Sequence, residues 1–108
     1  MIRSVLRFHP RPGGDGDLLE FFERRGILNR AINEGGCAAA EMYVRLPARD
    51  EVIVSALWNS AGDYDAWQRT ADRGDEIAEL ESLLEPASLP LPAGEVHEVV
   101  TWVPRTEA

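Results

Sequence analysis

Residues 38–58 read AAAEMYVRLPARDEVIVSALW, and this stretch decides the fold. Two runs rich in apolar and β-branched residues, Ala38 to Leu46 and Glu51 to Trp58, have the composition of strands. The segment between them, Pro47 to Asp50, is short and polar, as in a connection between antiparallel neighbours. The stretch therefore predicts a β-hairpin.

A strand and a helix are expected before the hairpin. Ile2 to Phe8 alternates and carries β-branched and aromatic residues, which predicts a strand that the prolines and glycines of His9 to Gly14 end. From Asp15 to Asn33 the apolar spacing becomes that of a single helix, closed by Gly35-Gly36. The apolar stripe of that helix consists of Leu18, Phe21, Phe22, Leu28 and Ile32.

Further helices and one strand are expected after the hairpin. Ser60 to Asp63 reads as the capping sequence of a second helix, and Asp75 restarts a short one. Pro86 to Pro92 predicts an extended connection, because its prolines disfavour a helix. Val96 to Val103 predicts the last strand. The apolar residues expected on these helices are Tyr64, Trp67 and Ala71, then Ile77, Leu80 and Leu84.

This order of elements is βαββαβ, that of a ferredoxin-like α+β domain. With right-handed crossovers, its common arrangement is an antiparallel sheet of order 4-1-3-2 with helices on one face. Apolar residues of the second hairpin strand occupy both faces, with Val52, Val54 and Trp58 on one and Ile53 and Leu57 on the other. A second copy would cover the face without helices, so we expect one domain over residues 1–108 that forms a homodimer.

Composition limits the partners and the location. The formal net charge is −8 at pH 7, so no cationic surface for nucleic acid is expected. A single cysteine, Cys37, excludes an internal disulfide and fits a reducing cytoplasm. No apolar run approaches the roughly 18 residues of a membrane span, and the N-terminus lacks the apolar core of a signal peptide. We therefore expect a cytoplasmic protein that binds neither nucleic acid nor membranes.

Two short motifs resemble one protein family. Gly36-Cys37 leads into the hairpin, and Leu57 to Trp67 (LWNSAGDYDAW) joins a strand end to a helix start. Both are similar to the corresponding segments of the antibiotic biosynthesis monooxygenases, and the order of elements resembles theirs over essentially the whole chain. The resemblance implies a dimeric α+β barrel with a ligand pocket between each sheet and its helices.

The resemblance also implies several activities, namely cofactor-independent oxygenation of aromatic polyketides, quinol oxidation and haem degradation. Haem-degrading members share an Asn on the first strand, a Trp on the second helix and a haem-ligating His about three turns later. Trp67 matches, but the first strand offers Arg7 and His9, and Gly74 to Ala78 contains no histidine. Haem degradation is the least favoured activity, and since no ligand spacing is evident, neither a cofactor nor a metal is expected.

Candidate binding residues lie on both expected helices. Arg25 and Asn29 are four residues apart inside the apolar stripe, where a polar pair is costly unless it is hydrogen-bonded or faces a wet pocket. They are candidate substrate-binding donors, or else Arg25 extends along the helix edge and Asn29 belongs to a fraying last turn. Trp67 on the second helix and Trp58 at the end of the strand before it are candidate pocket walls, with a purely structural core role as the alternative.

The remaining candidates lie on strands or at their ends. Tyr43 serves equally as a pocket wall and as a dimer-interface anchor. Asn59 either holds a substrate carbonyl or makes a turn. His9 and His97 are the two histidines, and the expected sheet order allows them to approach one another. Each is a candidate general base, because imidazole titrates near neutral pH, with an exposed strand-end histidine as the alternative.

These residues favour a small oxygenase, or a related tailoring enzyme, that acts on an aromatic, enolisable substrate. Once deprotonated, such a substrate is electron-rich enough to reduce dioxygen, so the protein supplies an apolar pocket, a base and donors to the developing oxyanion. A non-catalytic dimeric ligand-binding module of a biosynthetic pathway predicts the same pocket without a positioned base. A haem-binding protein is the third alternative.

Overall fold

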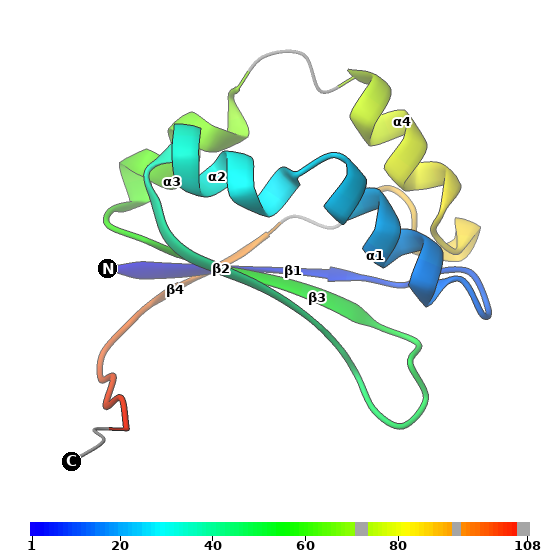
Figure 1. Ribbon diagram of the computed structural model, residues 1–108, viewed down its shortest axis with the longest axis horizontal. Helices are drawn as coiled ribbons and strands as arrows, with labels where there is room; N and C mark the ends of the chain where they lie inside the picture. The colour runs from blue at the N-terminus through cyan, green and yellow to red at the C-terminus, as the bar shows by residue number, and fades with distance from the viewer. Residues whose placement is uncertain (71–73, 92–93, 106–108) are drawn as a thin grey trace.

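The computed structural model describes residues 1–70, 74–91 and 94–105 (Figure 1). Its elements follow the expected order of strand, helix, strand, strand, helix, strand. In chain order they are β1 (Ile2–Phe8), α1 (Asp15–Arg24), α2 (Ile27–Gly35), β2 (Cys37–Val44), β3 (Val52–Trp58), α3 (Ala61–Gln68), α4 (Gly74–Ser82), a 3-10 turn (Pro86–Ser88) and β4 (Glu95–Glu98).

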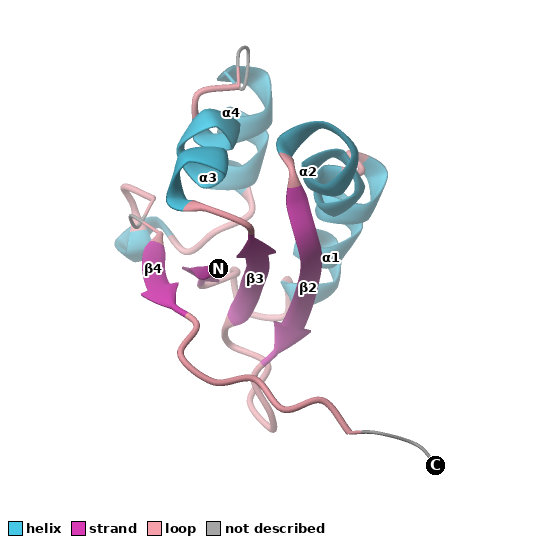
Figure 2. Ribbon diagram, turned by 90° about the vertical axis from the view of Figure 1, so that its left-hand side faces the viewer, coloured by secondary structure: helices cyan, strands magenta, loops and turns pink. Residues whose placement is uncertain are grey.

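The strands form one antiparallel sheet in the order β2-β3-β1-β4, which is the predicted order 4-1-3-2 read from the other edge. The helices all lie on one face of this sheet, as Figures 1 and 2 show. The predicted ferredoxin-like α+β fold is thereby confirmed. The bounds of β1 are also as predicted, and Ser60 caps α3 by accepting a hydrogen bond from the backbone N–H of Asp63.

The single helix predicted over Asp15 to Asn33 is wrong, because the segment forms two helices. Gly26 stands between α1 and α2 with φ 60° and ψ 33°, in the left-handed region. A residue with positive φ interrupts the helical hydrogen-bond ladder, and glycine takes that conformation without a steric penalty. The resulting bend between α1 and α2 is visible in Figure 1.

Two expectations for the C-terminal part are also wrong. Pro86–Ser88 forms a 3-10 turn instead of an extended segment, because proline is accommodated at the first position of a helical turn. The last strand was expected over Val96 to Val103, but β4 ends at Glu98. Glu98 pairs with Ile2, the first residue of β1, so only one further backbone bond, from Val99 to Met1, extends the ladder. Ala71 and Pro92 lie outside the described residues.

The core fills the space between the sheet and the helices in two clusters. One lies under α1 and α4, and the other lies under α2 and α3. The first consists of Phe8, Leu18, Phe21, Phe22, Val52, Leu80 and Leu84, and the second of Ala31, Cys37, Ala56, Trp58, Tyr64 and Trp67. We call this side of the sheet the inner face and the side without helices the outer face.

Candidate functional site

A cavity of about 200 Å³ lies between the inner face and the helices, where the two core clusters meet. Its volume exceeds the roughly 150 Å³ of an engineered apolar cavity that takes up benzene. Nearly all of its lining is aliphatic or aromatic. The lining residues are Ser4, Leu6, Phe8, Phe21, Phe22, Ile27, Leu28, Ala31, Ala40, Val54, Ala56, Trp58, Tyr64, Trp67, Glu76, Ile77, Leu80 and Leu91.

Aromatic rings form one end of the cavity. The Trp58 side chain is only 1% exposed, and its Nε1 donates a hydrogen bond of 2.9 Å to Oγ of Ser4 on β1. Its ring centroid lies 5.4 Å from that of Tyr64 and 6.4 Å from that of Trp67. Gly35 makes room for this group, since a Cβ at that position would come within 2.9 Å of Cε3 of Trp67. The aromatic end is therefore tightly packed and its shape is fixed.

Few polar groups line the cavity, and Ser4, Tyr64 and Glu76 each have a hydrogen-bond partner within the protein. The Ser4 hydroxyl accepts the hydrogen bond from Trp58, and the Tyr64 hydroxyl accepts one of 3.0 Å from Nε2 of Gln68. The third is Glu76, in the first turn of α4, whose carboxylate oxygens lie 2.9 and 3.0 Å from Nη2 of Arg30 on α2. Glu76 is the one charged residue among the described lining residues.

Glu76 was missed in the sequence because α4 is rich in acidic residues, which usually mark a solvated face. One signal was present. Glu76 precedes the buried Leu80 by four residues, so the two share one face of that helix. The reasoning that singled out Arg25 and Asn29 applies equally to this position.

The structure places Trp58 and Trp67 on the wall of the cavity and keeps Arg25 and Asn29 away from it. The Arg25 guanidinium donates to Glu79 of α4, at 2.7 Å from Nη2 and 3.2 Å from Nε. Asn29 is exposed and lines a separate depression between α1 and β2. Hydrogen bonds from Arg25 and Arg24 hold the pKa of the Glu79 carboxyl below its usual range. The interpretation that Arg25, Asn29 and Trp67 share one cavity is therefore wrong.

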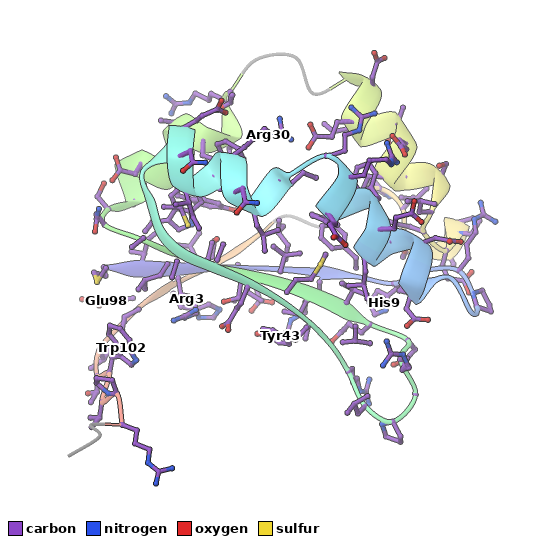
Figure 3. All side chains as sticks on the ribbon, viewed as in Figure 1. Arg3, His9, Arg30, Tyr43, Glu98 and Trp102 are labelled. Atoms are coloured by element: carbon purple, nitrogen blue, oxygen red, sulfur yellow. The ribbon has the colours of Figure 1, made fainter. Side chains whose placement is uncertain are left out.

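The two histidines are not brought together. His97 pairs with Arg3 in the sheet, and β4 reaches along β1 only as far as Val5, so His9 lies beyond its end. Figure 3 shows His9 and Glu98 at opposite ends of the sheet. Their expected approach is wrong because it assumed that β4 pairs with the end of β1, whereas it pairs with the beginning.

Each histidine instead lies near a glutamate. Nε2 of His97 is 3.2 Å from Glu95, and Nε2 of His9 is 3.7 Å from Glu51. Arg7 lies between these two glutamates, 2.9 Å from Glu95 and 3.4 Å from Glu51. The hydrogen bond from Arg7, helped by His97, holds the pKa of the Glu95 carboxyl below its usual range. In the described part of the chain, no three His, Cys, Asp or Glu side chains gather as they would around a metal ion.

The other candidates lie apart from the cavity. Tyr43 is on the outer face, where its side chain is 44% exposed (Figure 3), and Asn59 is exposed directly after β3. Cys37 is buried, and its Sγ–H lies within hydrogen-bonding distance of the backbone oxygens of Ala39 and Leu57. Burial raises the pKa of this thiol, which disfavours the reactive thiolate. Cys37 is therefore a structural residue.

An aromatic-walled cavity between an antiparallel sheet and its helices defines a class, namely small α+β ferredoxin-like proteins with a cavity between the two layers. A family model described as antibiotic biosynthesis monooxygenase matches residues 1–77 of the 108. The chain therefore belongs to the antibiotic biosynthesis monooxygenase family. None of the curated proteins matches it significantly in sequence.

Several solved structures share the fold. Rv0793 from Mycobacterium tuberculosis is 20% identical, with a TM-score of 0.68 over 99% of this chain and 97% of that one. A variant of SnoaB, a cofactor-independent oxygenase from Streptomyces nogalater, is 12% identical, with a TM-score of 0.75 over 96% and 97%. NE2512, a protein of unknown function from Nitrosomonas europaea, is 17% identical, with a TM-score of 0.70 over 98% and 95%. At these identities the likeness concerns the fold alone.

Among the described residues, no helix is long and apolar enough to cross a membrane.

Proposed function

We propose that the protein is a cofactor-independent monooxygenase, or a related tailoring enzyme, that acts on an aromatic, enolisable small molecule in the cytoplasm. The observation that carries this proposal is the apolar cavity with Trp58 and Trp67 on its wall, in a chain of the monooxygenase family. SnoaB, which shares the fold, is a cofactor-independent oxygenase by name. Flat aromatic walls suit a planar substrate, since rings stack on one another in offset or tilted arrangements.

The chemistry needs no external reductant. A ring CH₂ that becomes a C=O gives up four electrons, and these reduce one dioxygen, of which one oxygen atom enters the product and the other leaves as water. The substrate becomes electron-rich by losing a proton, and exclusion of water by the apolar walls protects the reactive intermediate. The volume of about 200 Å³ lies below the roughly 300–1,000 Å³ of typical drug-sized sites, which favours a substrate of one or two rings.

Oxygen uptake tests this proposal directly. The protein is mixed with a panel of one- and two-ring hydroxyaromatic compounds in air-saturated buffer without added cofactor. We expect uptake of one O₂ per molecule of product, with a rate that saturates in substrate and falls at least tenfold in Trp67→Phe. Uptake that does not exceed the uncatalysed rate with any compound, while the same compounds bind, would reject the oxygenase.

We also propose a homodimer joined through the outer face. The described tail after β4 carries exposed apolar side chains, including Trp102, which is 66% exposed and lines a depression over the outer face with Arg3 and Leu57. Figure 3 shows Trp102 and Tyr43 on this same side of the sheet. Burying both with a second copy would remove apolar surface that a monomer leaves in water. Light scattering should give a mass near twice 12.0 kDa.

One observation favours a second candidate, a non-catalytic ligand-binding module. Among the described residues that line the cavity there is no histidine, so neither His9 nor His97 is placed as a base there. A binding module predicts saturable binding of aromatic ligands with no oxygen uptake. The same two measurements, ligand binding and oxygen uptake, therefore separate the candidates.

A further inference from the structure

We infer that Glu76, held in place by Arg30, is the residue of the cavity that determines specificity. It accepts a hydrogen bond from a ligand hydroxyl and makes the cavity select neutral hydroxyaromatic molecules over aromatic carboxylates. This inference deepens the proposed function by naming the ligand class, and it takes the cavity of that proposal as the binding site.

The position of Glu76 carries the first step. Its side chain is only 12% exposed, and it lines a cavity whose other walls are nearly all apolar. Arg30 reaches it from α2, so the ion pair joins α2 to α4 on the helical side of the cavity; Figure 3 labels Arg30 on this side of the sheet. A carboxylate in such surroundings interacts with a ligand more strongly than one in water does, because the local dielectric constant is lower.

The second argument is the hydrogen-bonding capacity of the Glu76–Arg30 pair. Two carboxylate oxygens offer about four acceptor positions, and among the described residues Nη2 of Arg30 is the only hydrogen-bond partner of both oxygens. On the guanidinium, Nε of Arg30 is buried and has no hydrogen-bond partner in the described structure. Arg30 itself does not line the cavity, so the spare capacity that a ligand can reach lies on the Glu76 carboxylate, which is suited to a ligand oxygen that carries a proton.

The charge of the site carries the third step. Hydrogen bonds to an ionised acceptor are among the stronger ones in proteins, so a hydroxyl donor is favoured beside Glu76. A ligand carboxylate there would meet a like charge in a poorly solvated place, and the protein as a whole carries a net charge of −8. The other polar lining groups, Ser4 and Tyr64, already accept hydrogen bonds from Trp58 and Gln68.

Calorimetric titration with three naphthalene probes tests the inference on the unmodified protein at neutral pH. The probes are 1-naphthol, 1-methoxynaphthalene and 1-naphthoate, which share the ring system and differ in the donor and the charge. We expect 1-naphthol to bind at least tenfold more tightly than 1-methoxynaphthalene, which lacks the donor. We expect 1-naphthoate, which carries a negative charge, to bind the most weakly of the three. Equal affinity for the first two, or no binding of any probe, overturns the inference.

A matched pair of variants locates the effect. Glu76→Gln keeps the shape and removes the charge, so we expect the preference for 1-naphthol over 1-naphthoate to fall at least tenfold. Glu79→Gln changes a carboxylate on the same helix that does not line the cavity, and it should leave the preference unchanged. An unchanged preference in a folded Glu76→Gln overturns the inference; should that variant not fold, the three probes on the unmodified protein still decide it.

Oxygen uptake keeps this test separate from that of the proposed function. Selective binding of 1-naphthol without oxygen uptake by any hydroxyaromatic would reject the oxygenase and leave the role of Glu76 intact. Oxygen uptake by a protein whose selectivity does not depend on Glu76 would reject the role of Glu76 and leave the oxygenase intact.

Discussion

The two faces of the sheet use the same strands for different purposes. Along β1, Ser4, Leu6 and Phe8 point to the inner face and line the cavity, whereas Arg3 and Arg7 point to the outer face. Both arginines form ion pairs there, Arg3 with Glu41 and Arg7 with two glutamates. Because successive side chains of a strand alternate between faces, one short sequence builds an apolar site on one side and a charged surface on the other.

This difference suggests that ligand binding belongs to the inner face of the sheet and association of two copies to the outer face. The inner face is covered by the chain's own helices, and a largely apolar cavity lies between the two layers. The outer face has no helix and offers charged pairs together with Tyr43 and the tail that carries Trp102. We therefore expect substitutions on the inner face to alter stability and ligand binding, and those on the outer face to alter association.

The largest effect is expected from Trp58→Ala on the inner face. It removes a fully buried indole together with its hydrogen bond to Ser4, so the free energy of unfolding should fall by about 3–5 kcal/mol. Tyr43→Ala, on the outer face, should lower it by less than about 1 kcal/mol. Urea denaturation at submicromolar protein, where association contributes least, measures both. Similar losses in the two variants would contradict the division between the faces.

The second prediction concerns association. Changing Tyr43 and Trp102 together to glutamate places negative charge on the outer face of a protein that already carries −8. The dimer dissociation constant should rise at least tenfold, which corresponds to about 1.4 kcal/mol or more. Light scattering over a dilution series measures it, and Asn33→Ala on the exposed side of α2 is the control. A dimer of unchanged affinity would show that the copies join through another surface.

The third prediction compares two glycines of the helical layer. Neither Gly26 nor Gly16 has atoms near the place of an added Cβ, but only Gly26 has a positive φ. Gly26→Ala should lower the free energy of unfolding by about 1–2 kcal/mol through backbone strain alone. Gly16→Ala, inside α1, should leave it unchanged or raise it slightly. Thermal melts of both variants measure the difference, and equal melting temperatures would show that the break between α1 and α2 needs no glycine.

The smallest effect is a pH dependence of the helical layer. Hydrogen bonds from Arg25 and Arg24 lower the pKa of Glu79 in the folded state relative to the unfolded state. Their contribution to stability is therefore present above the ordinary glutamate pKa of 4.5 and is lost as the pH falls through the lower folded value. Glu79→Gln should flatten the acid limb of the stability curve, whereas Glu20→Gln, an exposed control on α1, should not. A parallel acid limb in Glu79→Gln would show that the pair does not form in solution.

Local patterns in the sequence predicted most of the fold. Alternation over Ile2 to Phe8 and the hairpin of residues 38–58 gave the strands, and the capping role of Ser60 was visible from its neighbours. These features depend on residues close together in the chain, so sequence reasoning reaches them. The bend at Gly26 was missed because the apolar residues keep their helical spacing on both sides of it. That spacing gives no sign that one residue between them has a positive φ.

The sequence by itself determined the order of the elements and the two faces of the second hairpin strand, and it offered Trp58 and Trp67 as candidate pocket walls. Only the tertiary structure decided the polar partners. Arg25 and Arg30 lie in similar positions at the helical layer, yet Arg25 binds Glu79 outside the cavity and Arg30 binds Glu76 at its wall. These partners are 54 and 46 residues apart in the chain, so their pairing follows from how α4 packs against α1 and α2. Periodicity fixes which face of a helix a side chain occupies, but the packing of helices fixes what that side chain meets.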